Sequence, residues 1–256
     1  MRSSRVSAVV LCLLAVLSAG CTPRTARRGA NVLDYLYPEG KVQASADEVR
    51  LSLPLRVGVS FAPANGKSPE ADVFSEPQKR EILTRVAEAF RGTPDVSFVE
   101  ILPTHNLVAK GGFENLRQIA GMYGVNLVAL VSYDQIQFDD QDFSSLLYMT
   151  IVGLYLVPAD RLETHTLLDA SVFEVESRAL LFTGSGSSIV KTRATAVDAS
   201  RELRSDSVAG FEQATADMIA NLKITLGVFR ENAKKGTVRG IGTPRVQIQT
   251  AESSTR

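Results

Sequence analysis

The stretch VNLVALVSY, residues 125–133, decides the fold of this chain. It is a nearly continuous run of apolar and strand-forming residues, which is typical of a strand buried on both faces of a sheet. A strand of that kind lies at the centre of its sheet. The run therefore predicts an α/β domain organised around this segment.

Strands and helices alternate on the amino-terminal side of this run. Residues 55–61, LRVGVSF, place apolar residues at every second position, as a strand with one buried face does. Ser75 and Gln78 form a capping box, which predicts a helix that begins there and ends at Gly92. The order strand, helix, strand, helix, strand implies right-handed crossovers and parallel pairs in one sheet. Residues 96–102 are the second strand of this series. The buried stripe of the first helix consists of Ile82, Leu83, Val86 and Phe90. That of the second helix consists of Leu116, Ile119, Ala120 and Tyr123, and Gly124 marks its end.

The pattern changes after the central run. Residues 146–158, LLYMTIVGLYLVP, are apolar but too few for a transmembrane helix, and their Tyr, Thr, Ile and Val favour a strand. Residues 165–175 and 179–190 continue with strand-like composition, and residues 176–178 form a tight turn between them. This half predicts an antiparallel meander added to the same sheet. The alternative for residues 146–157 is a hairpin that dips into the membrane.

A long helix and a polar tail complete the chain. Apolar residues recur at steps of three and four, which predicts a helix packed across the sheet, with a coiled coil to a partner as the alternative. We therefore expect a single α/β domain over residues 51–235: a β-α-β-α-β unit, an antiparallel meander and a long C-terminal helix on one mixed sheet. Residues 236–256 show no apolar periodicity and are expected to be disordered. The helical stripe consists of Val208, Phe211, Thr215, Met218, Ile219, Leu222, Leu226 and Phe229.

Residues 1–20 have the pattern of a lipoprotein signal peptide. A charged start and an apolar run too short to span a membrane lead to AGC at residues 19–21. Two small residues before a cysteine indicate a lipoprotein cleavage site, with acyl chains such as palmitate on Cys21. The alternative is ordinary cleavage after Ala19, which leaves a free thiol. Because Cys12 lies in the leader, the mature chain has one cysteine and no internal disulfide, so an attachment point is the better interpretation.

Residues 21–50 are expected to join the lipid to the domain. Residues 22–31, TPRTARRGAN, are interpreted as a tether whose arginines either touch anionic headgroups or stay in water. Residues 32–40, VLDYLYPEG, are too apolar for a solvated linker and are expected to dock onto the domain, with a partner-binding patch as the alternative. Thr22 resembles an outer-membrane sorting signal, so we expect an outer-membrane lipoprotein that faces the periplasm.

The composition excludes several classes of function. The chain has 28 basic and 28 acidic residues, and removing the two arginines of the leader leaves a net charge of about −2, so no basic excess marks a nucleic-acid-binding protein. The absence of Trp weakens a carbohydrate-stacking role. The two histidines, His105 and His165, are isolated from each other and lack a zinc-site spacing. Neither a metal nor another cofactor is expected.

The chain contains no recognised catalytic motif. SIVK at residues 188–191 matches the S-x-x-K of penicillin-recognising enzymes, but the companion motifs are absent and the fragment ends a strand. GSGSS at residues 184–188 fits a backbone anion site, yet the close of a hairpin is the simpler interpretation. DDQD at residues 139–142 lacks the Gly and Glu of an EF-hand loop and is interpreted as a solvated acidic turn. An enzyme of unrecognised type would have to draw on Asp134, Asp139, Asp140 and His105.

Several phrases of the chain carry a family resemblance. They are VLDYLYP (32–38), LPLRVGVSFAP (53–63), IAGMYGVNLVALVSYDQIQF (119–138), THTLLDASVFEVESRALLF (164–182) and RELRSDSVAGFEQATADMIANL (201–222). Together they resemble the rhombotarget lipoproteins, bacterial lipoproteins of unassigned activity. The resemblance implies a substrate of rhombosortase, a membrane protease expected to act at a C-terminal glycine-rich motif. Here the tail has only separate glycines, with no Gly-Gly pair.

A more distant resemblance concerns the order of elements alone. That order is similar to the curli-secretion lipoprotein, to lipoprotein activators of penicillin-binding proteins and to the N-terminal domain of the Tol-system translocation protein. A likeness of fold carries no function by itself.

The sequence favours a non-catalytic, lipid-anchored envelope protein. It would bind a partner in envelope assembly, secretion or surface-protein processing. The expected contact surfaces are the loop at residues 62–74, the acidic turn at Asp139 and the hairpin near Gly184. One alternative is an oligomeric ring or pore with residues 146–157 as an inserted hairpin, and the other is the unrecognised enzyme.

Overall fold

The apolar run at residues 125–133 lies in the inner strand of the main sheet, where its composition predicts it. The computed structural model describes residues 24–28, 31–41, 48–63, 76–141, 160–194, 198–235 and 245–250. In chain order the elements are β1 (Arg24–Arg28), α2 (Val32–Leu36), β2 (Glu48–Leu53), β3 (Leu55–Phe61), α3 (Glu76–Phe90), β4 (Val96–Ile101), the 3-10 helix η1 (Thr104–Asn106), α4 (Gly112–Tyr123), β5 (Leu127–Gln141), β6 (Asp160–Glu174), β7 (Ala179–Ala194), α6 (Ala199–Lys234) and β8 (Arg245–Thr250).

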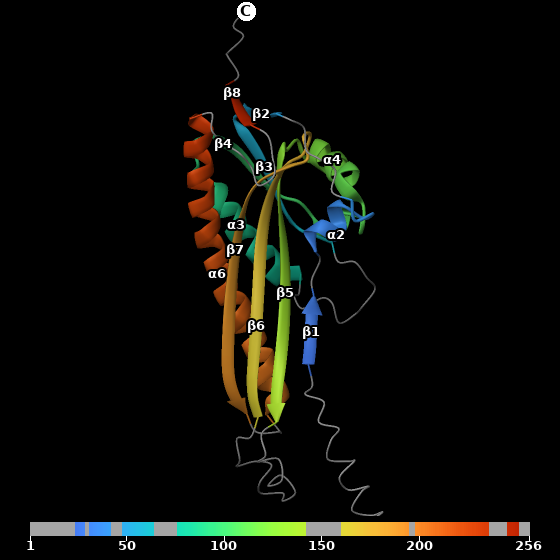
Figure 1. Ribbon diagram of the computed structural model, residues 1–256, viewed down its shortest axis with the longest axis vertical. Helices are drawn as coiled ribbons and strands as arrows, with labels where there is room; N and C mark the ends of the chain where they lie inside the picture. Colours follow the sequence, from blue (N-terminus) through green and yellow to red (C-terminus); the bar gives the residue numbers. More distant parts are fainter. Residues whose placement is uncertain are drawn as a thin grey trace, which may run out of the picture.

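The main sheet is mixed and has the order β4-β3-β5-β6-β7, with β1 paired to the far part of β5 (Figure 1). Strand β3 runs parallel to β4 and to β5, and the crossovers contain α3 and α4. Strands β6 and β7 then follow as antiparallel neighbours. The predicted β-α-β-α-β unit, meander and long C-terminal helix are confirmed.

Glycines end both crossover helices. Gly92 follows α3 with a φ of 79°, and Gly124 caps α4 with a φ of 64°. The N–H of Gly124 donates to the carbonyls of Ala120 and Gly121, which α4 leaves unpaired at its end. Glycine adopts this left-handed conformation without side-chain strain, so both predicted helix ends are confirmed.

Two apolar clusters hold helices on opposite faces of the sheet. Side chains of α3 and α6 pack on one face, over Leu127, Ala129 and Val131 of β5. Side chains of α2 and α4 pack on the other face, over Val128 and Leu130. Because successive side chains of a strand point to opposite faces, one continuous apolar run supplies both clusters.

Residues 32–40 pack against the domain through α2. Val32, Tyr35 and Leu36 are buried in the cluster that contains α4. The hydroxyl of Tyr35 donates to Oδ1 of Asn115 at 3.0 Å, and burial raises the pKa of Tyr35 above its ordinary value. Most of the apolar surface of this segment is therefore part of the core rather than an exposed patch.

Two segments that the sequence places outside the domain form strands. Residues 24–28, expected within a tether, form β1 and pair antiparallel with residues 134–138 of β5. Residues 245–250, expected within a disordered tail, form β8 and pair in parallel with β2, with Val246 opposite Val49. Both valines are fully buried, and this burial offsets the conformational entropy lost on ordering the strand. Both expectations are therefore corrected.

Two fragments expected in turns lie inside long strands. Residues 184–188, GSGSS, are in the middle of β7, so the prediction that they close a hairpin is wrong. The turn that joins β6 to β7 is at residues 176–178, as predicted. Asp139 and Asp140 are paired residues of β5 rather than part of an acidic turn, because the β5–β6 pairing continues to the end of the strand.

Several sequence-based expectations fall outside the described residues. They concern residues 1–20, Cys21, Ser75, the apolar segment 146–158 and most of the loop 62–74. Among the helices of the described part, none is both long and apolar enough to cross a membrane.

Candidate functional site

Beyond the ends of β3 and β4, the sheet continues as a narrow extension that we call the blade (Figure 1). The blade consists of residues 132–141 of β5, 160–169 of β6 and 185–194 of β7, with β1 along the edge of β5. Helix α6 runs along one face of it. In the described part of the chain, no helix covers the opposite face, which we call the open face.

Two glycines allow α6 to lie very close to β7. A Cβ built on Gly186 would lie 2.1 Å from the carbonyl oxygen of Ala214 and 2.2 Å from the nitrogen of Met218. A Cβ on Gly184 would lie 2.7 Å from the Cα of Leu222. A glycine inside a strand often marks such a close backbone approach. The GSGSS fragment is therefore a packing motif for α6.

The face of the blade beneath α6 is polar, and several hydrogen bonds join it to the helix. The Nε2 of Gln135 donates to Oγ1 of Thr166 at 2.8 Å and to the carbonyl of Ser207 at 3.2 Å. The hydroxyl of Ser207 donates back to Oε1 of Gln135 at 2.7 Å. The Nε2 of Gln137 likewise donates to Oγ1 of Thr164 at 3.1 Å and to the carbonyl of Leu203 in α6 at 2.8 Å. Since buried polar groups must find partners, these bonds select one position of α6 on the strands.

Helix α6 also occupies part of the outer edge of β7. The carboxylate of Asp217 accepts from the N–H of Ser187 at 3.0 Å, and Nδ2 of Asn221 donates to the carbonyl of Ser185 at 2.7 Å. Backbone groups that side chains already bind are not available to another strand. Nearer the end of the blade, the same edge carries the exposed Lys191, a charge that also opposes strand addition.

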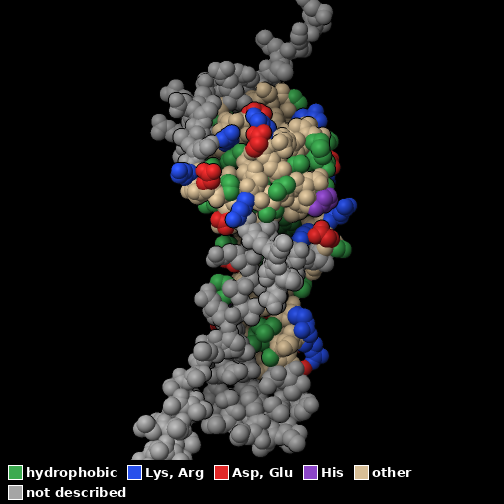
Figure 2. Space-filling model, turned by 90° about the vertical axis from the view of Figure 1, so that its right-hand side faces the viewer, with side chains coloured by type: hydrophobic (Ala, Val, Ile, Leu, Met, Phe, Trp, Pro, Cys, Tyr) green, Lys and Arg blue, Asp and Glu red, His purple; other side chains and the backbone are tan. Residues whose placement is uncertain are grey.

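The open face has an apolar centre. Leu167 and Ile189 are 44% and 56% exposed, and Ile136 lies in the same register row as His165 and Ile189. Together with Asp134 these side chains line a hollow of about 320 Å³. Apolar side chains grouped in this way are typical of an interaction surface. Figure 2 shows the narrow lower part of the molecule from the side on which β1 lies.

A charged cluster borders this centre. The Nζ of Lys191 lies 2.8 Å from Oε1 of Glu163, and Nε2 of His165 lies 3.3 Å from Oε2 of the same carboxylate. The hydrogen bond from Lys191, followed by that of His165, lowers the pKa of Glu163. Because these side chains are solvent-accessible, their pairing adds little to stability and mainly fixes the charge pattern beside the apolar centre.

The structure does not bring Asp134 and His105 into one site. Asp134 lines the hollow on the open face, whereas His105 lies in η1 and does not line it. The side chains of Asp139 and Asp140 are outside the described ones. His165 lines the hollow as well, opposite Ile136 and two residues along the strand from Leu167, the partner of Asp134, and only the strand register reveals this position. In the described part of the chain, no group of three His, Cys, Asp or Glu residues is placed to hold a metal ion.

A small cleft of about 80 Å³ lies between α3 and α6. Val208 lines this cleft and is 46% exposed, so the prediction that it belongs to the buried stripe is wrong. The other members of the stripe are buried or packed against the core, as predicted. Helical periodicity predicts which side of α6 faces inward, but not where α3 leaves that side uncovered.

Another hollow, of about 330 Å³, lies between the end of α2 and the start of α4. Tyr37, Phe113 and Arg178 line it, with the guanidinium of Arg178 5.9 Å from the ring centroid of Phe113. Burial raises the pKa of Tyr37, and the charge of Arg178 opposes this shift. The ring of Tyr37 packs edge-on against that of Phe113 with centroids 5.6 Å apart, and this contact fastens residues 32–40 to the domain.

Comparison with known proteins finds neither a matching family model nor a matching curated sequence. Among solved structures, the chain is similar to the PelC dodecamer from Paraburkholderia phytofirmans, with 12% identity over 79% of this chain and 97% of that one and a TM-score of 0.34. It is also similar to a putative neuraminyllactose-binding hemagglutinin homolog from Helicobacter pylori, with 10% identity over 77% and 94% and a TM-score of 0.36. The hypothetical protein CT253 from Chlamydia trachomatis matches with 9% identity over 68% and 99% and a TM-score of 0.32. At these values the likeness says nothing about activity or assembly.

Proposed function

We propose that this protein is a lipid-anchored, non-catalytic protein of the bacterial envelope that binds a partner protein. The observation that carries the proposal is the leader at residues 1–20, which ends at Cys21 after two small residues. Acyl chains on Cys21 hold the protein in the membrane, since each buried methylene contributes about 0.8 kcal/mol. The location that the sequence favours is the periplasmic side of the outer membrane. The quoted phrases support membership of the rhombotarget lipoproteins.

The open face of the blade is the surface we assign to the partner. Its exposed Leu167 and Ile189 lie beside a hollow of about 320 Å³, and the Glu163 cluster borders them. An apolar centre with a charged border is the usual composition of a protein interface. Such a surface suits a role in envelope assembly, secretion or surface-protein processing.

Site-specific photo-crosslinking in cells tests this assignment. A photoreactive residue at Leu167 or Ile189 is expected to give a discrete adduct with one envelope protein. Ile224 and Val228 provide matched controls, because they are aliphatic, 63% and 55% exposed, and lie on α6 away from the open face. Adducts of equal yield at all four positions, or none at the first two, would refute the assignment.

Replacement of Cys21 by Ala tests the anchor separately. The variant is expected to fold normally and to move from the membrane fraction to the soluble fraction. A variant that still sediments with membranes contradicts lipid anchoring at this residue.

Assembly into a ring or pore is the alternative architecture. The β7 edge of the blade carries the exposed basic residues Lys191 and Arg193. Like charges oppose the pairing of such edges between copies, so strand addition does not favour a ring. The mass of the detergent-solubilised protein distinguishes the two architectures.

A further inference from the structure

The register of β1 brings Arg24, three residues after Cys21 in the sequence, close to the end of the blade. Arg24 pairs with Phe138, only three residues before β5 ends at Gln141. Cys21 precedes Arg24 by three residues, and three residues span at most about 10 Å. Strand β1 runs antiparallel to β5, so the chain before Arg24 leads toward the end of β5. The structure therefore replaces an expected tether of about thirty residues with one of about three.

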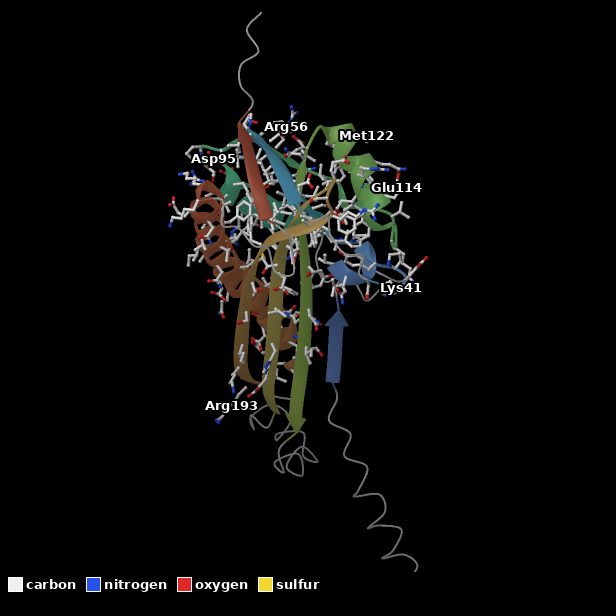
Figure 3. The ribbon with its side chains drawn as sticks, turned by 45° about the horizontal axis from the view of Figure 1, so that its top comes forward. Lys41, Arg56, Asp95, Glu114, Met122 and Arg193 are labelled. Carbon is white, nitrogen blue, oxygen red and sulfur yellow. The ribbon has the colours of Figure 1, made fainter. Side chains whose placement is uncertain are left out.

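Other parts of the chain reach the same end of the molecule. Gln141 pairs with Asp160 and Asp160 with Ala194, so β5, β6 and β7 end level with one another. Helix α6 begins close to this end, because Gln137 bonds to the carbonyl of Leu203. Figure 3 shows Arg193 near this end and Met122 at the opposite end of the molecule.

The sequence at this end is compatible with a lipid surface. Arg193 and Arg204 are exposed and form no ion pair within the described residues. Exposed arginines near a bilayer attract anionic headgroups.

We infer that the end of the blade is the membrane-contacting surface of the protein. The inference rests on the lipid at Cys21 proposed above. The long axis of the molecule lies along the membrane normal. The start of α6 is at the lipid headgroups, and α4 is at the end of the molecule farthest from the bilayer. Arg193 and Arg204 contact the phosphate groups of anionic lipid.

The depth of labelled cysteines tests this orientation. The acylated full-length protein is reconstituted into vesicles of phosphatidylethanolamine and phosphatidylglycerol that contain a lipid with a spin label on its headgroup. A fluorophore is attached to Ser200→Cys at the start of α6 or to Met122→Cys in α4, both exposed positions. Quenching at position 200 is expected to be several-fold stronger than at position 122. Equal quenching, or stronger quenching at position 122, would overturn the inference.

An inserted linker tests the role of the short tether. Ten Gly and Ser residues between Cys21 and Arg24 are expected to reduce quenching at position 200 while the protein still floats with the vesicles. Unchanged quenching would show that the tether does not set the orientation and would also overturn the inference. Flotation is measured first on the protein without the linker. If that protein does not float, the lipid anchor itself fails, an outcome distinct from either quenching result.

Discussion

Replacing Gly186 by Ala should strongly destabilise the protein, although it adds one methyl group. The new Cβ would lie 2.1 Å from the carbonyl oxygen of Ala214 and 2.2 Å from the nitrogen of Met218, both of them backbone atoms of α6. Ordinary contacts between heavy atoms need about 3.5 Å, so α6 has to move outward by about 1 Å. A side-chain rotation cannot relieve this clash.

The cost follows from the surface that α6 buries. Overpacking a core typically costs about 1–3 kcal/mol, and a gap of about 1 Å forfeits a quarter to a half of each lost dispersion contact. The apolar side chains of α6 nearest the clash, Met218 and Leu222, are fully buried and lose contacts together. We therefore expect a loss of about 3 kcal/mol in the free energy of unfolding.

Urea unfolding of the leaderless Cys21→Ala protein, followed by far-ultraviolet circular dichroism, measures this loss. For a domain of this size it corresponds to a fall in Tm of roughly 6–12 °C. Gly227 is the matched control, since it lies on the same helix and an added Cβ meets no atom within 4 Å. Gly227→Ala is expected to stabilise the helix by about 0.5–1 kcal/mol. Equal stability of Gly186→Ala and the parent protein would refute the packing argument.

Three further predictions concern other parts of the structure. Gln135→Ala leaves buried hydrogen-bonding partners unsatisfied, and we expect the free energy of unfolding to fall by about 2–4 kcal/mol in the same urea assay. Deleting residues 245–256 removes the buried Val246 and should cost about 1–3 kcal/mol, whereas deleting residues 251–256 should cost nothing measurable. Lys191→Met should raise the pKa of Glu163 toward its ordinary value in an NMR titration. Because the native contacts lower this pKa, they favour the folded state above the unfolded pKa, and that contribution disappears as pH falls through the folded pKa.

The elements that the sequence predicts well are those with local signals. The continuous apolar run at residues 125–133 specifies a strand and both of its buried faces. The alternation of residues 55–61 specifies a strand but predicts one buried face, whereas Gly58 and Ser60 are buried on the other face as well. Gly92 and Gly124 mark helix ends through a backbone conformation that other residues rarely adopt. These signals depend on neighbouring residues, so they can be identified before the tertiary structure is known.

The elements that the sequence misses depend on distant partners. RVQIQT at residues 245–250 alternates as a strand should, but its partner β2 lies about two hundred residues earlier in the chain. Strand β1 pairs through backbone groups, and its sequence RTARR has no apolar alternation. Gly184 and Gly186 indicate either a turn or a close approach, and only the path of α6 decides between them.

The open face limits where a partner can come from. Strand β5 has 15 residues and α6 has 36, so the two elements span roughly 50 Å at the usual rise per residue. If the end of the blade contacts the bilayer, the open face stands along the membrane normal and is reached from the side. A partner that contacts Leu167 must then lie within roughly 30 Å of the membrane surface, since this residue is seven positions from Asp160, where β6 begins at the end of the blade. An envelope partner is therefore expected to be membrane-attached itself, and adducts recovered from Leu167 should fractionate with membranes even when Cys21→Ala protein supplies the photoreactive residue.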